Sequence, residues 1–330
     1  MKSEKIKLSD IAKIMGISTI SVSRALSGQE GVSDELRDRV LRKANEMGYL
    51  RTKNLEQNKV LVLHQKPFIQ DNSNFSHIMQ GMEKALQAAG CEYDMEFADK
   101  NNQVKLSLPN KLQKGVHYDG IIFIGGFDNS YVDFITKKIS NYVCYTGYSP
   151  SKDCDGIWYN FNNSGYQQCE YLIKKGHKRI GYLGNHNGYV SKEKILGIIS
   201  AMEDHGLTAQ NQFFVYSEDD YEERMIKLIK KTSGPTALIC QWDYTAMKLI
   251  KSLHDHGIKV PEDISIIGHG NTEMSALCIP ALTTMEIYID YACESTVALL
   301  LKRLGRPDKP SENILIDSTL IERDSVKNLI

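Results

Sequence analysis

Few features of this sequence point to an exported or membrane-bound protein. The 330 residues include only seven cysteines, and no two of them form a CxxC pair. That spacing argues against a disulfide framework or a zinc site and favours buried thiols in a reducing compartment. No apolar run approaches the roughly 20 residues that a membrane helix needs, and the charged N-terminus lacks the apolar segment of a secretory signal. We therefore expect a cytoplasmic protein that does not contact a membrane.

Motifs of the common enzyme classes are also missing. The sequence contains no GxSxG, HExxH or GxxxxGK[ST] pattern. His254 and His256 are separated by one residue of a predicted helix, so their side chains do not face together. The pair Gly125-Gly126 follows a predicted strand but lacks the rest of a dinucleotide fingerprint. We expect no catalysis, no cofactor and no metal.

Length and charge indicate two parts of different size and sign. A chain of this length exceeds one compact core and suits a small module joined to a larger body. Residues 1–59 hold twelve Lys and Arg against eight acidic residues, whereas the remainder holds 28 against 33. A basic module on an acidic body fits a polyanionic partner at one end only.

Three short helices are predicted near the N-terminus, over residues 8–15, 19–26 and 34–47. Each has apolar residues at helical spacing. Serines stand where the helices would begin, so Ser9, Ser18 and Ser33 are the expected N-caps. Gly16 ends the first helix, and the short step from Gly16 to Ser18 is typical of a helix-turn-helix.

The second helix has an exposed face of uncommon composition. Thr19, Ile20, Ser23 and Arg24 lie on it, and only Arg24 is long and charged. An ordinary solvated face is richer in Glu and Lys. A face that enters a DNA groove needs small residues and a few side chains that reach base edges or phosphates. Periodicity alone also allows a small helical cap or linker.

The run DIAKIMGISTISVSRALSG, followed by GVSDELRDRVLRKANEMGYL, resembles the headpiece of the LacI/GalR family of bacterial repressors. The resemblance covers the whole predicted helical module. It implies that Thr19, Ile20 and Arg24 read base edges in the major groove. The other residues implied to face the DNA, through phosphates, helix support or the connector, are Ser9, Ser18, Ser21, Ser23, Ser33, Tyr49 and Leu55.

The connector departs from the family pattern. In the family, a hinge helix that follows a Pro-Asn pair places a leucine in the minor groove and kinks the DNA. Here residues 50–58 contain no proline, and the segment is several residues shorter. Leu55 is the only candidate for the wedge, and an ordinary linker leucine is the alternative.

From Lys59 onward, apolar runs alternate with helical patterns. Strands are predicted at 60–63, 119–125, 141–147, 179–184, 213–217, 236–240 and 264–270, with helices between most of them. Fully apolar runs such as 119–125 are typical of strands covered on both faces. This βα alternation predicts parallel, doubly wound sheets, whose ligands bind at the carboxyl ends of the strands.

The resemblance continues through the body, more loosely, along 176–184 and 257–268. It implies an all-α helix-turn-helix headpiece on a two-lobed, type I periplasmic-binding-protein-like α/β core. The implied parts are a headpiece at 1–50, a hinge at 51–58 and a core at 59–330, with an N-lobe of about 59–160 plus 288–318 and a C-lobe of about 161–287 plus 319–330. Apolar faces of the helices over 80–90 and 293–305 are candidates for pairing in a homodimer.

The family's sugar-binding positions hold other residues in this chain. Gly147 replaces an aspartate, Lys194 replaces an arginine, and Gln241-Trp242-Asp243 stands where an Asn-Asp pair is usual. A Gly-His-Gly-Asn run replaces a Gly-aromatic-Asp-Asp loop. The candidate effector site consists of Phe68, Asn74, Phe75, Asp128, Gly147, Lys194, Trp242, Asp243, His269 and Asn271.

Several of these residues also have an ordinary structural interpretation. Trp242 either stacks on a sugar or other ring or packs the lobes together, and Lys194 either meets a ligand or is solvated. His269 and Asn271 either contact a ligand or shape a loop, and Asp243 alternatively caps the helix that follows it.

The sequence therefore predicts a DNA-binding transcription regulator of repressor type. Its two-fold dimer would read a near-palindromic operator in double-stranded DNA, under control of a saccharide bound between the lobes. The alternative is a regulator with an eroded pocket that responds to a protein partner or to no ligand.

Overall fold

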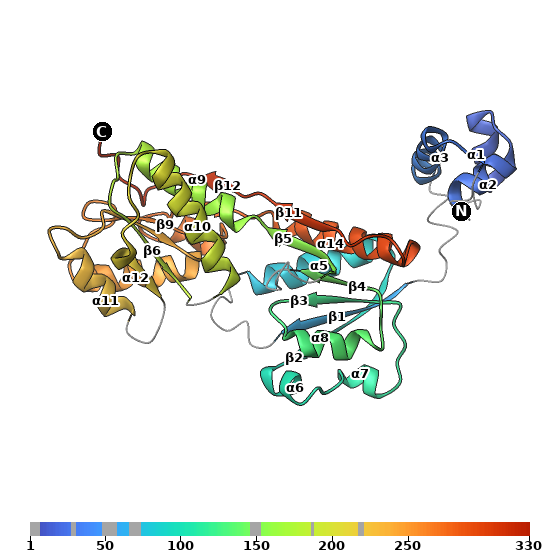
Figure 1. Cartoon of the computed structure of the whole chain (residues 1–330), viewed down its shortest axis with the longest axis horizontal. Coiled ribbons are helices and arrows are strands. Elements are labelled where there is room, and N and C mark those ends of the chain that lie inside the picture. The colour runs from blue at the N-terminus through green and yellow to red at the C-terminus, as the bar shows by residue number, and fades with distance from the viewer. Residues whose placement is uncertain are drawn as a thin grey trace. The chain divides into compact units, whose positions relative to one another are not determined.

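The computed structural model describes residues 7–27, 31–47, 58–65, 74–145, 153–185, 188–216 and 221–330. The chain divides into two compact units that meet between Asn58 and Lys59 (Figure 1). We call residues 1–58 the headpiece and residues 59–330 the body.

The headpiece is built from α1 (Leu8–Met15), α2 (Thr19–Ser27) and α3 (Asp34–Glu46). Its small core takes two apolar side chains from each helix. These are Ile11 and Ala12, Val22 and Ala25, and Val40 and Ala44. The helix-turn-helix predicted from the spacing is thereby confirmed.

Two of the three predicted serine caps are present. Ser18 Oγ accepts the backbone N–H of Ser21 at 3.0 Å, and Ser33 Oγ accepts that of Leu36 at 3.3 Å. The prediction for Ser9 is wrong, because α1 begins at Leu8 and already includes Ser9, with Lys7 at the N-cap position. The carboxylate of the first turn, Asp10, accepts the Lys7 N–H at 2.7 Å and leaves no capping role for Ser9.

One lobe of the body is a six-stranded parallel sheet in the order β11-β5-β4-β3-β1-β2. Its strands are β1 (Lys59–Gln65), β2 (Glu92–Ala98), β3 (Gly120–Ile124), β4 (Tyr142–Tyr145), β5 (Asp155–Tyr159) and β11 (Asn313–Ile316). The helices α5 (Phe75–Ala88) and α14 (Ile289–Gly305) cover one face, and α8 (Asn129–Thr136) packs on the other, with α6 (Lys100–Val104) and α7 (Asn110–Gln113) beside it (Figure 1). Coverage of both faces explains why β3 is apolar throughout.

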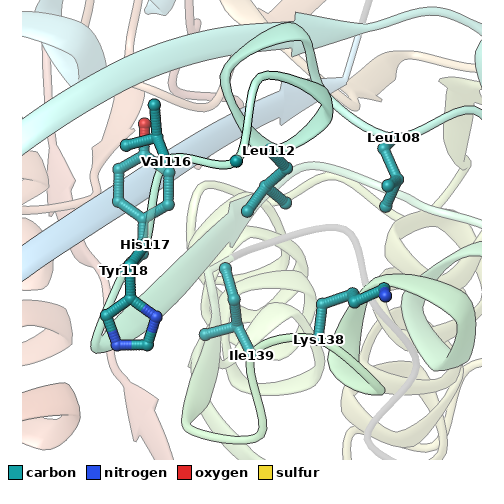
Figure 2. A pocket seen from close by; sticks show the side chains of 8 residues that line it. Leu108, Leu112, Val116, His117, Tyr118, Lys138 and Ile139 are labelled. Carbon is teal, nitrogen blue, oxygen red and sulfur yellow. The ribbon is translucent and has the colours of Figure 1, made fainter.

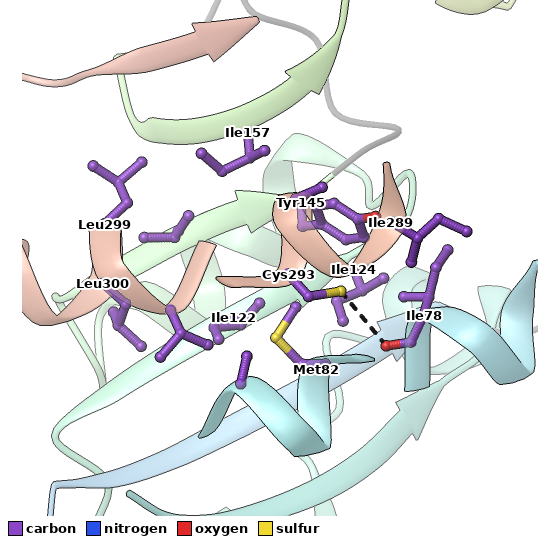
Figure 3. Packing of buried hydrophobic residues seen from close by; sticks show 14 of the residues in the cluster. Ile78, Met82, Ile122, Ile124, Tyr145, Ile157, Ile289, Cys293, Leu299 and Leu300 are labelled. Carbon is purple, nitrogen blue, oxygen red and sulfur yellow. Dashed lines mark hydrogen bonds between the residues drawn. The ribbon is translucent and has the colours of Figure 1, made fainter. Parts of the chain in front are cut away.

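The helices α5 and α14 pack against each other inside this lobe. Met82 of α5 and Cys293 of α14 belong to the same buried cluster, and Cys293 Sγ lies 3.8 Å from the carbonyl oxygen of Ile78 (Figure 3). The apolar faces over 80–90 and 293–305, predicted to pair two subunits, are therefore used within one chain.

The other lobe is a four-stranded parallel sheet in the order β7-β6-β8-β9. Its strands are β6 (Ile180–Gly184), β7 (Phe214–Tyr216), β8 (Ala237–Cys240) and β9 (Ser265–Ile267). The helices α9 (Phe161–Lys174) and α10 (Tyr189–Asp204) cover one face, and α11 (Tyr221–Ile229) and α12 (Asp243–Asp255) cover the other. The prediction of parallel sheets wound on both sides is confirmed, although β2, β5 and β11 were not predicted.

The chain passes between the two sheets three times. It does so between β5 and α9, between β10 (Thr284–Glu286) and α14, and between β11 and β12 (Thr319–Ile321). Asn160, at the first crossing, donates to Asp317, at the third, over 2.8 Å. Tyr288, at the second, donates to Thr319 over 2.8 Å. The crossings are thus fastened to one another by side chains.

Asn160 also caps α9, since its Oδ1 accepts the backbone N–H of Asn163 at 3.1 Å. Phe161 therefore opens α9 directly after the first crossing.

Candidate DNA-binding surface and effector site

The exposed face of α2 has the predicted composition. Thr19, Ser23 and Arg24 are exposed, and Ile20 keeps 63% of its surface accessible. The opposite face, with Val22 and Ala25, is buried against the other two helices. Because every exposed side chain of this face except Arg24 is short, its backbone is able to approach a groove closely.

The serines of the headpiece fall into two groups. Ser18 and Ser21 bond to each other, Oγ to Oγ at 2.9 Å, and so rigidify the start of α2. Ser9 and Ser33 are exposed. The other two predicted DNA contacts, Tyr49 and Leu55, lie outside the described residues.

Aromatic rings from both lobes meet at the carboxyl ends of the strands in the body. Trp242 follows β8 and His269 follows β9, whereas Phe161 belongs to the core of the six-stranded lobe. The ring centroids of Trp242 and His269 lie 5.4 Å apart, and each lies within 6 Å of Phe161, at 5.9 and 5.6 Å. We call these three residues the ring cluster.

The imidazole of His269 is buried, and neither ring nitrogen has a hydrogen-bond partner among the described residues. Burial, together with the positive charge of Lys194, holds its pKa well below the usual range, so the ring is neutral. Nearby, Gln168 donates to the Gly268 carbonyl at 2.6 Å, and its own Oε1 lacks a partner in the same part of the chain. Unsatisfied buried polar atoms are a common mark of a ligand or water site.

Lys194 is fully buried rather than solvated. Its ammonium donates to the backbone oxygen of Gln241 at 3.0 Å and lies 5.8 Å from the centroid of the Trp242 ring. The Lys194 ammonium is therefore part of the surroundings of the ring cluster and lies beside Trp242, which is half-buried.

Two other predicted effector contacts are engaged within their own lobe. The Asp243 carboxylate accepts hydrogen bonds from Thr272 and Thr284, at 2.8 and 2.5 Å. It does not cap α12, whose N-cap position is Trp242. Asn271 donates to Glu286 at 2.6 Å and accepts from Arg323 at 2.6 Å. Both side chains thus stabilise the loop after β9.

The remaining predicted contacts are spread over the six-stranded lobe. Asn74 is buried at the start of α5, and its amide nitrogen lies against Gly270 of the other lobe, so it reaches the interlobe region. Phe75 instead packs on His64 and Phe97, at 5.4 and 6.0 Å. Asp128 is paired with Lys100 at 2.7 Å on the α6–α8 side. Phe68 and Gly147 lie outside the described residues.

Sequence reasoning missed Phe161 and Gln168. Phe161 opens a helix just after a crossing between lobes, and a large aromatic residue at that place is the signal that was available. Gln168 sits on a helix of ordinary composition, and nothing in its neighbourhood marks it.

A shallow pocket of about 220 Å³ lies elsewhere in the six-stranded lobe (Figure 2). It is lined by Leu108, Leu112, Gly115, Val116, His117, Tyr118, Lys138 and Ile139. Several of these residues precede β3, so this pocket is not at the carboxyl ends where the ring cluster lies. In the described part of the chain no helix is long and apolar enough to span a bilayer, and no group of His, Cys, Asp and Glu is arranged to hold a metal.

Comparison with known proteins agrees with this architecture. A family model for bacterial regulatory proteins of the lacI family matches residues 7–52, and one for a periplasmic binding protein-like domain matches residues 169–326. The two units thus define a helix-turn-helix regulator with a periplasmic-binding-protein-like body. The chain therefore combines the helix-turn-helix domain of the lacI family of bacterial regulatory proteins with a periplasmic binding protein-like domain.

Relatives match along nearly the full length. The transcriptional repressor CytR of Escherichia coli is 28% identical, over 98% of this chain and 96% of its own. The ribose operon repressor of Haemophilus influenzae is 25% identical, over 98% and 99%. Among solved structures, the complex of the regulator CelR with cellobiose has a TM-score of 0.70 at 19% identity, over 97% and 99%. A lac repressor dimer bound to operator has a TM-score of 0.68 at 19% identity, over 98% and 100%.

Proposed function

We propose that the protein is a transcriptional repressor that binds operator DNA through the exposed face of α2. The observation that carries this proposal is the composition of that face, with Thr19, Ile20, Ser23 and Arg24 accessible on a helix held in place by the Ser18 cap. Arg24 would donate to a guanine edge. Ser9, Ser18, Ser21, Ser33, Tyr49 and, in the connector, Leu55 would contact or support the DNA backbone and minor groove.

Binding-site selection from a randomised duplex pool tests this proposal. We expect enrichment of a near-palindrome, because one headpiece reads too few base pairs and a two-fold homodimer reads two half-sites. Loss of Arg24 in the variant Arg24→Ala should then weaken binding to the selected site by about tenfold or more, the range of one good side-chain–base contact. Binding to unrelated DNA should fall much less.

A matched control is Arg39→Ala, which removes an exposed arginine of α3. It should change specific and nonspecific binding by the same factor. If the pool enriches no sequence, or if Arg24→Ala weakens specific and nonspecific binding by the same factor, α2 does not read bases.

We further propose that a small molecule, of saccharide class, binds beside the ring cluster and changes operator affinity. Support comes from the half-buried face of Trp242, from the His269 ring nitrogens, which have no partner in the part of the chain that the structure describes, and from the position of Asn74 at the interlobe region. Two similar proteins carry ribose or cellobiose in their names. Coupling of this kind commonly changes affinity by 5- to 150-fold, about 1–3 kcal/mol.

The alternative function, a regulator that answers to a protein or to no ligand, also has specific support. Asp243 and Asn271 are fully used inside their lobe, and Lys194 is buried under Trp242. A thermal-shift screen of the full chain with ribose, cellobiose and other saccharides separates the two. A ligand at 100 times its dissociation constant should add about 2.7 kcal/mol to the free energy of unfolding, and a silent screen would favour the alternative. As a DNA-bound repressor, the protein would act in the cytoplasm.

A further inference from the structure

The exposure of the Ile20 side chain is not what a residue that only stabilises the headpiece would show. With 63% of its surface exposed, Ile20 contributes little to the headpiece core. Val22, on the opposite face of the same helix, is fully buried in that core. A β-branched residue on the outside of a nine-residue helix also lowers helix propensity. Its neighbours on the same face, Thr19 and Ser23, are short and leave its methyl groups accessible.

We infer that Ile20 reads the 5-methyl group of a thymine in each operator half-site. This inference rests on the proposed function, because it requires α2 to lie in the major groove. Isoleucine has no donor or acceptor, so it cannot satisfy the polar edge atoms of guanine, adenine or cytosine. Thymine is the only base that presents a methyl group there. Facing any other base, Ile20 would bury polar atoms without partners.

The experiment removes that methyl group and nothing else. In the site selected from the pool, each thymine is replaced in turn by deoxyuridine, which keeps base pairing and every donor and acceptor. We expect one position in each half-site at which the replacement weakens binding of the full chain by about fourfold, the affinity equivalent of one buried methyl group. The other thymine positions should respond less.

The variant Ile20→Ala identifies the side chain responsible. At the responsive position, the affinities of Ile20→Ala for the thymine operator and the deoxyuridine operator should agree within about 1.5-fold. That difference is clearly smaller than the effect of about fourfold expected for the unaltered chain. Ile14→Ala is the matched control, because Ile14 is equally accessible, at 60%, but lies on α1. Ile14→Ala should still bind the deoxyuridine operator about fourfold more weakly than the thymine operator, as the unaltered chain does. An unchanged melting temperature of both variants would show that the headpiece is intact.

A gain of affinity provides a second readout. Where cytosine replaces the responsive thymine, 5-methylcytosine should restore part of the lost affinity for the unaltered chain and none for Ile20→Ala. A selected operator whose thymines all tolerate deoxyuridine, or an Ile20→Ala variant that keeps the penalty, overturns the inference while leaving the proposed function intact. Failure of the pool to enrich any sequence would instead overturn the proposed function.

Discussion

Arg303 donates two parallel hydrogen bonds to the carboxylate of Asp155, from Nε at 2.8 Å and from Nη2 at 3.0 Å. The carboxylate is completely buried, and the ammonium of Lys309 completes the group at 2.6 Å. Burial opposes ionisation of Asp155, but the hydrogen bonds from Arg303 and Lys309 outweigh it and hold the pKa of the carboxyl below its usual value. The group joins the start of β5, the end of α14 and the segment before β11.

Replacing this carboxylate should be costly. In Asp155→Asn the partly buried guanidinium of Arg303 loses its paired carboxylate and Lys309 keeps only Glu312, at 3.4 Å, so we expect the free energy of unfolding to fall by about 3 kcal/mol. Urea denaturation measures the change. Asp255→Asn breaks an exposed pair with Lys251, 2.7 Å long, and should leave the urea transition almost unchanged, because water and salt screen an exposed pair. Equal effects of the two variants would contradict a special role for the buried group.

The buried imidazole of His64 makes stability depend on pH. It lies between Phe75 and Phe97, without a polar partner in the described residues, and burial lowers its pKa to about 4. In the unfolded chain its pKa is near 6.5, so the unfolded state binds more protons between these values. Stability should therefore be complete above about pH 6.5 and decline as the pH falls towards 4, by about 3 kcal/mol from this group.

The contribution of His64 is isolated by comparison with His64→Leu, which cannot titrate. The difference in unfolding free energy between the two proteins should change by this amount between pH 7 and pH 4, with the unaltered chain losing more. His254→Leu serves as the control, because His254 has a side chain that is 86% exposed. A pH profile that His64→Leu leaves unaltered would assign the acid sensitivity to other groups.

The cap of α2 should be important for the headpiece. Loss of the Ser18 hydroxyl in Ser18→Ala leaves the Ser21 N–H without its partner, and we expect a destabilisation of about 1 kcal/mol. Ser9→Ala, on the exposed first turn of α1, should change stability by less than about 0.5 kcal/mol. Circular dichroism of the thermal transition of the headpiece measures both. Similar losses in the two variants would mean that the Ser18 bond adds nothing.

Trp242 offers a direct signal for the effector. The chain has two tryptophans, so Trp158→Phe leaves Trp242 as the only indole. A saccharide that raises the melting temperature of this variant should also shift or quench its fluorescence, because the ligand would desolvate the half-buried ring. The variant itself should melt lower, since Trp158 donates to Asn313 at 2.7 Å. A ligand that stabilises the variant without changing its emission would bind away from the ring cluster.

Local signals were sufficient for most of the fold. Runs without a charged residue, such as 121–124, identify strands covered on both faces, and Gly16 and Ser18 mark the tight turn of the headpiece. The strand β2 was not predicted because it is a half-exposed edge strand, and its sequence EYDMEFA contains three acidic residues. The strand β5 was not predicted because it begins with Asp155, whose charge is paired with Arg303, about 150 positions later in the sequence.

The candidate site was less predictable for the same physical reason. Asp243 was assigned to the effector or to a helix cap because the partners that it has, Thr272 and Thr284, are 29 and 41 residues away in sequence. The burial of Lys194 depends on α9 and α10 packing so closely that a side chain at Gly165 would meet the Lys194 backbone. Contacts of this range follow from the assembled lobe and leave no periodic pattern in the chain.

The interleaved path of the body has a consequence for synthesis on the ribosome. The six-stranded lobe takes its edge strand from residues 313–316, so this lobe stays incomplete until long after the strands of the four-stranded sheet have been made. The headpiece core is complete by Ala44. Since chains grow vectorially at about 5–20 residues per second, nascent molecules would display a finished three-helix module while the rest still exposes unpaired strand edges.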